Sequence, residues 1–129
     1  MESGKNHRSE LGQLGERLAC ELLMGMGHTI LERNWRSGHL EIDIISFDAE
    51  GIHFVEVKTR RNNIQAPPQE NVDRKKQERI VRAAQNFLKK GKGVPAGSHE
   101  CMFDVVAITF HGDKCSTEWI PQAFIPLYV

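Results

Sequence analysis

LEIDIIS at residues 40–46 and IHFVEVKTR at residues 52–60 are the two stretches that decide the fold. Both are rich in β-branched residues, and residues 47–51 (FDAEG) between them have the composition of a tight turn. The pattern predicts two antiparallel strands that are apolar enough to lie inside a sheet. A turn closed by Asp48 and Gly51 would set their register.

That register brings charged side chains together. Asp43 would face Glu56, and Glu41 would face Lys58, with Cβ atoms of opposed residues about 4.5–5.5 Å apart. Two carboxylates at this separation repel each other unless a proton or a cation lies between them. Mg²⁺, with Mn²⁺ as a substitute, binds carboxylate oxygens and completes its coordination with water and phosphate. The hypothesis is a metal site on Asp43 and Glu56, with Lys58 serving the attacking water in phosphodiester hydrolysis.

The same four residues also have a structural interpretation. Glu41 and Lys58 could form a salt bridge between the strands, with Asp43 and Glu56 at an exposed strand end. An acid followed by E-x-K is too short a motif to distinguish these two interpretations by itself.

Leucines at three- and four-residue spacing predict a first helix that begins near Ser9 and ends at Gly25 and Gly27. Glu16 lies off this leucine stripe, on a helix face of small and apolar residues. That face could approach the sheet closely and carry the carboxylate to the metal site, where Glu16 would assist. A solvated Glu16 is the alternative.

A second helix is predicted over residues 70–90, with Gly91 as its C-cap. Lys76 falls inside its buried stripe, so this lysine must extend outward to solvent or meet an anion. Lys76, Arg79 and the strand residue Arg60 are candidates for contacts with a nucleic-acid backbone. They would form a local basic patch, because 17 basic and 17 acidic residues give no net charge to attract DNA. A solvated helix face is the alternative.

The remaining strands are predicted at residues 28–35, 103–110 and 114–120, which gives the order αβββαββ. The expected fold class is α/β, one domain over residues 1–129 with helices covering a central mixed sheet.

Composition and cysteine usage predict a soluble, cytoplasmic protein. The N-terminus has no apolar signal-peptide region, and no apolar run approaches the roughly 20 residues of a membrane helix. The three cysteines are widely separated and are expected to be free thiols. The six histidines are scattered, so each is predicted to be a surface or turn residue rather than a metal ligand.

Several short motifs, taken together, resemble the small bacterial YraN-like protein family. They are Gly15-Glu16, Arg33-Asn34-Trp35-Arg36, E-I-D-I-I at residues 41–45, F-V-E-V-K-T-R at residues 54–60, the spacing of Lys76 and Arg79, and Phe103-Asp104-Val105-Val106. This family belongs to the restriction-endonuclease-like, or PD-(D/E)XK, nuclease superfamily.

The resemblance implies a restriction-endonuclease-like fold with Asp43, Glu56 and Lys58 as the nuclease core. It also implies that Glu16 is an auxiliary acid near the metal, as in archaeal Holliday-junction resolvases. Substrates across the superfamily are mostly DNA, so the leading hypothesis is a Mg²⁺-dependent endonuclease acting on DNA, including branched or damaged DNA.

Two other functions stay open. The first is a nucleic-acid-binding module that has the fold but does not cleave. The second is a protein-interaction domain or homodimer, in which Phe124, Leu127 and Tyr128 pack on a partner or on a second copy.

Overall fold

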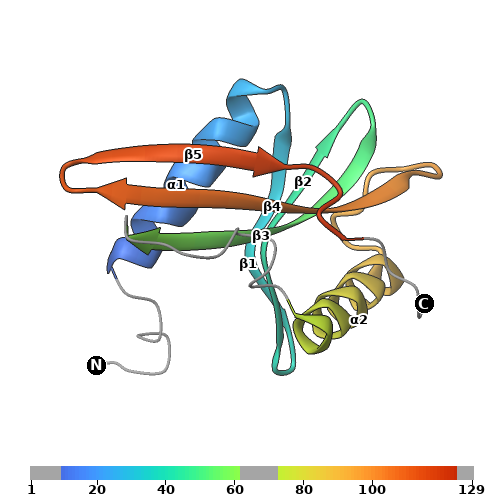
Figure 1. The fold of residues 1–129 in the computed structure, drawn as a ribbon. Coiled ribbons are helices and arrows are strands. Elements are labelled where there is room, and N and C mark those ends of the chain that lie inside the picture. The colour runs from blue at the N-terminus through green and yellow to red at the C-terminus, as the bar shows by residue number, and fades with distance from the viewer. Residues whose placement is uncertain (1–9, 62–72, 125–129) are drawn as a thin grey trace.

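One sheet with a single parallel pair of neighbouring strands organises the chain. The computed structural model describes residues 10–61 and 73–124. Its five strands lie in the order β1-β2-β3-β4-β5; β3 and β4 run parallel, and the other neighbours are antiparallel (Figure 1). The elements are α1 (Glu10–Gly25), β1 (Thr29–Ser37), β2 (Leu40–Asp48), β3 (Gly51–Arg61), α2 (Arg74–Lys90), β4 (Glu100–His111) and β5 (Lys114–Ile120). The predicted mixed α/β fold and its order αβββαββ are confirmed.

The two helices cover opposite faces of this sheet. A parallel pair needs a long crossover, and α2 lies within the connection from β3 to β4. Phe54 packs in the hydrophobic cluster under α2, whereas Val55 packs in the cluster under α1. Because successive side chains of a strand point to opposite faces, α1 and α2 lie on different sides of β3.

The buried face of α1 differs from the leucine stripe that the sequence emphasises. Leu14 and Leu18 are only half-buried, whereas the small-residue face is fully buried. That face consists of Gly15, Glu16, Ala19, Cys20 and Leu23. At Gly15 the helix comes so close to β3 that an added Cβ atom would collide with the Thr59 hydroxyl. The small residues therefore allow a closer approach to the sheet than the leucines would.

Helix α2 is positioned by its two caps. The Asp73 carboxylate accepts a hydrogen bond from the Lys76 backbone N–H at 2.8 Å, and Gly91 ends the helix with φ of 68°. The predicted core stripe of Ile80, Ala83, Ala84 and Phe87 is buried, while the predicted start at residues 70–72 lies outside the described residues.

The predicted register between β2 and β3 is correct but covers less of the strands than expected. Five residue pairs run from Asp48–Gly51 to Ile44–Val55, and the ladder ends there. Beyond it β2 remains paired with β1, and β3 remains paired with β4. The predicted direct opposition of Asp43 with Glu56 therefore lies past the end of the ladder, where the two strands diverge.

Two further expectations concern cysteines and membrane spans. All three cysteines are free, as predicted. Within residues 10–61 and 73–124, neither helix combines the length and the apolar character that a transmembrane span requires.

Replacing Gly15 with alanine is expected to destabilise the fold by about 1–3 kcal/mol, because the new methyl group collides with Thr59. Urea unfolding measures this change. Gly25→Ala, at a helical position with open space around it, is the control and should not destabilise. Adding Thr59→Ala should recover most of the loss; an unchanged double variant would contradict the close-packing explanation.

Candidate functional site

A pocket of about 160 Å³ opens where β2 and β3 diverge, and α2 closes one side of it. Its polar lining consists of His39, Glu41, Asp43, Glu56, Lys76 and Arg79. Four residues that the sequence marks as candidates, Asp43, Glu56, Lys76 and Arg79, thus share one cavity. β2, β3 and the crossover helix α2 each contribute residues to it.

Asp43 holds the diverging strands in place. Its Oδ2 atom accepts a hydrogen bond from the Val57 backbone N–H at 2.9 Å. This contact satisfies a backbone donor of β3 just where the β2–β3 ladder has ended. The carboxylate is therefore fixed at the mouth of the opening and not free to rotate away.

Asp43→Ala is expected to lower the free energy of unfolding by about 1–3 kcal/mol, because it leaves the Val57 N–H without its acceptor. Asp43→Asn retains a carbonyl oxygen at the same place and should cost clearly less. Urea unfolding of both variants compares these losses. Equal destabilisation would mean that the hydrogen bond contributes little to the fold.

Glu56 is a nearly buried carboxylate with two lysines beside it. Its Oε2 atom lies 2.7 Å from Lys76 Nζ and 3.8 Å from Lys58 Nζ. Burial disfavours the Lys76 ammonium, but the charge and hydrogen bond of Glu56, together with the charge of Asp43, raise the pKa of Lys76. Lys76, which was predicted either to extend to solvent or to meet an anion, thus meets the anion Glu56.

Lys58 lies on the same face of β3 as Glu56 and directs its ammonium toward that carboxylate. The direct opposition on which the alternative salt bridge between Glu41 and Lys58 was predicted lies past Ile44, where the ladder has ended. Glu41 instead has Arg36 of β1 as a neighbour, with 3.7 Å between Oε2 and Nε.

Glu16 is buried, with 5% of its surface exposed, so the solvated alternative is wrong. It follows Gly15, which abuts Thr59 of β3, and therefore reaches the sheet from the face opposite α2. Glu16 does not line the pocket. Among the residues that the structure describes, Glu16, Asp43 and Glu56 do not converge within 4.8 Å as a set of metal ligands.

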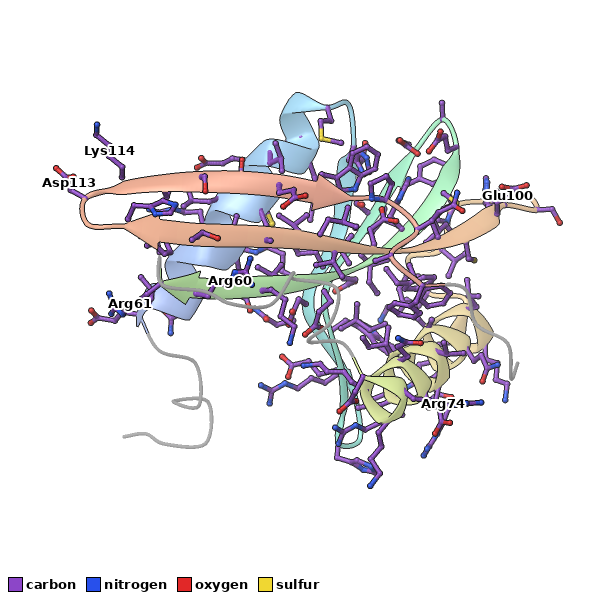
Figure 2. The ribbon with its side chains drawn as sticks, in the orientation of Figure 1. Arg60, Arg61, Arg74, Glu100, Asp113 and Lys114 are labelled. Carbon is purple, nitrogen blue, oxygen red and sulfur yellow. The ribbon has the colours of Figure 1, made fainter. Side chains whose placement is uncertain are left out.

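The three basic residues predicted to contact nucleic acid do not all lie in one place. Arg79 lines the pocket together with Lys76, which lies about one turn before it on α2. Arg60 lies farther along β3, opposite Thr109 of β4 and away from Arg74 at the start of α2 (Figure 2). Arg60 does not line the cavity, so the structure does not gather all three into one patch around it.

Sequence reasoning assigned no role to Asn34, which also belongs to this region. Its neighbours in β1 pair with Ile42 and Ile44, so Asn34 lies opposite Asp43. Its φ of 53° is a left-handed conformation that asparagine tolerates better than most residues. Within residues 10–61 and 73–124, its buried Oδ1 atom accepts no hydrogen bond. The Arg-Asn-Trp-Arg motif was the available signal for this position.

The prediction that every histidine is a surface or turn residue is wrong for His28 and His53. Both side chains are 1% exposed and lie beside Asp48 at the turn end of β2 and β3. Burial and the neighbouring His53 lower the pKa of His28. Burial also disfavours the charged form of His53, but hydrogen bonds with Asp104 and Asp48 raise its pKa. Only folding brings these residues together, because they are far apart in the sequence.

The fold and the pocket together define a class: a mixed α/β domain whose two central strands diverge around paired acids and lysines. The chain belongs to the family described as uncharacterised protein family UPF0102, whose model matches residues 15–108. The resemblance to the YraN-like family is thereby confirmed, and the matched range contains Glu16, Asp43, Glu56 and Lys58.

UPF0102 proteins of other bacteria align with most of this chain. A UPF0102 protein of Nitratidesulfovibrio vulgaris (strain Hildenborough) is 41% identical over 117 residues, which cover 91% of this chain and 85% of that protein. UPF0102 proteins of Geobacter metallireducens and Bacteroides thetaiotaomicron are 43% and 38% identical, and each alignment covers 92% of this chain and 94% of the relative. These names state family membership and no activity.

Proposed function

We propose that the chain is a Mg²⁺-dependent endonuclease that hydrolyses phosphodiester bonds of DNA. The observation that carries this proposal is the convergence of Asp43 and Glu56 in one open pocket, with Lys58 beside Glu56. These are the acid, acid and lysine that the resemblance to the nuclease superfamily assigns to the reaction. Salt bridges alone would not require an open pocket around them.

The residues fit a hard divalent cation. Mg²⁺ prefers a few carboxylate oxygens and leaves other positions to water and phosphate, and Asp43 and Glu56 both line the cavity. Lys76 Nζ, 2.7 Å from Glu56 Oε2, supports a site at which this carboxylate attracts positive charge. Bound there, Mg²⁺ would lower the pKa of a water molecule and neutralise charge on the phosphate.

The protein residues have separate tasks in this proposal. Asp43 supplies one carboxylate, which the Val57 N–H holds in place. Glu56 supplies the second carboxylate from the neighbouring strand. Lys58 orients the attacking water and stabilises the negative charge that develops on the phosphate. Lys76 and Arg79 hold the DNA backbone beside the cavity, and a phosphate that attracts Lys76 would release Glu56. Glu16 lies on the other face of β3 and outside the pocket, so this proposal gives it no task in the reaction.

Asp43→Asn and Glu56→Gln are each expected to reduce Mg²⁺-dependent cleavage by at least about 100-fold, because each variant loses a charged ligand. Gel assays on branched, nicked, single-stranded and duplex DNA measure the rate. Glu118→Gln, an exposed position on β5, is the matched control and should keep full activity. If the wild-type protein cleaves none of these substrates with Mg²⁺ or Mn²⁺, the proposal of an enzyme fails.

Lys76→Ala and Arg79→Ala are expected to weaken DNA binding and to lower the slope of log K against log salt by about 1 each, since each residue neutralises one phosphate. Fluorescence anisotropy with Ca²⁺ in place of Mg²⁺ measures binding without turnover. Lys114→Ala, at the start of β5, is the control and should leave the slope unchanged. Unchanged slopes for Lys76 and Arg79 would place the DNA elsewhere.

The two alternatives remain distinguishable. A steep salt dependence of binding without any cleavage would favour the non-cleaving module. For the protein-interaction alternative, Phe124 is partly buried against Phe103, with 5.3 Å between ring centroids, while Leu127 and Tyr128 lie outside the described residues. Phe124 thus contributes to this chain's own core.

A further inference from the structure

We propose that His28, Asp48 and His53 form a second metal site, for Zn²⁺ or a similar transition-metal ion, at the turn end of β2 and β3. His53 Nε2 lies 2.8 Å from Asp48 Oδ1, and His28 Nε2 lies 3.3 Å from Asp48 Oδ2. The candidate ligand atoms of all three residues lie within 4.8 Å of one another. Two imidazoles and a carboxylate are a donor set that binds Zn²⁺ in proteins.

Both imidazoles are oriented as metal ligands are. Each presents Nε2 to Asp48, and each is held through Nδ1 by another residue: His53 by Asp104 Oδ2 at 2.6 Å and His28 by Ser46 Oγ at 2.9 Å. Histidine ligands usually make such an outer hydrogen bond, which fixes the ring and its tautomer. Such an arrangement leaves both Nε2 atoms directed at the Asp48 carboxylate, each toward a different oxygen.

The outer partner of His53 is itself held in place. Asp104 accepts hydrogen bonds from the Gln122 backbone N–H at 2.9 Å and from Trp119 Nε1 at 3.3 Å. The candidate site is therefore supported from β2, β3, β4 and β5, and it does not depend on a single loop. This support keeps the ligand atoms in place before any ion binds.

The dimensions suit a small tetrahedral ion. Bonds of about 2.0–2.1 Å in a tetrahedron place ligand atoms about 3.3 Å apart, which is the separation of His28 Nε2 and Asp48 Oδ2. His53 Nε2 and Asp48 Oδ1, hydrogen-bonded at 2.8 Å, would move apart by about 0.5 Å to admit the ion. Both histidine side chains are 1% exposed, whereas Asp48 is 19% exposed and gives the site its contact with solvent. Water can therefore supply the fourth ligand from the side of Asp48.

The chemistry separates this site from the pocket of the proposed nuclease. Imidazole ligands favour Zn²⁺, Co²⁺, Ni²⁺ and Cu²⁺, whereas Mg²⁺ prefers oxygen ligands. Asp48 lies five positions along β2 from Asp43, on the order of 17 Å away in an extended strand. An ion between His28, Asp48 and His53 would join the segment before β1 to β2 and β3, so its role would be to stabilise the fold.

Zinc binding to the full chain tests this proposal. After the protein is stripped with a chelator and the chelator is removed, calorimetric titration with ZnCl₂ should show one ion bound per chain, and the thermal midpoint should rise. Asp48→Asn should weaken binding by at least about 100-fold, as should His28→Gln. His111→Asn, at an exposed histidine, and Glu56→Gln, in the other pocket, should both bind as the wild type does.

Co²⁺ provides an independent spectroscopic readout. Four-coordinate Co²⁺ at this site should give visible absorption bands that are lost in Asp48→Asn and in His28→Gln, with circular dichroism confirming that each variant is folded. Absence of one-to-one zinc binding by the wild-type protein would overturn the proposal. Equal affinity in folded Asp48→Asn would also overturn it, and either result would leave the proposed nuclease unaffected.

Discussion

The candidate site depends on one constraint, the end of the β2–β3 ladder after Ile44 and Val55. Past this point β2 stays paired with β1, and β3 stays paired with β4. The two strands therefore separate inside a continuous sheet. The Asp43 carboxylate compensates for the lost pairing by accepting the Val57 N–H. Continued pairing would have closed the space in which the pocket lies.

The second requirement is charge balance in a nearly buried place. An isolated buried carboxylate is costly, and Glu56 avoids this cost through Lys76 and Lys58. Lys76 comes from α2, the helix that the parallel pairing of β3 with β4 requires. The crossover that completes the sheet therefore also brings the balancing charge. An overall net charge of zero conceals this local grouping.

The hairpin of β2 and β3 has different chemistry at its two ends. The open end has carboxylates, the Lys76 ammonium and the Arg79 guanidinium group around one cavity, which suits a hard cation and a phosphate. The turn end buries two imidazoles beside Asp48, which suits a softer ion held for stability. The two groupings lie on the same strands without overlapping, because Asp43 and Asp48 are five residues apart along β2.

The sequence by itself determined the elements, their order and the register of β2 with β3, because side-chain periodicity and a tight turn are local properties. It also placed Glu56 and Lys58 on one face of a strand and Asp43 on the neighbouring strand, because alternation of side chains along a strand is local. Only the tertiary structure decided where the ladder ends, which face of α1 is buried, that Lys76 meets Glu56 and that His28 meets His53. These contacts join residues that are distant in the chain. They depend on the positions of whole elements, which are set by the close packing at Gly15 and by the divergence of β2 from β3.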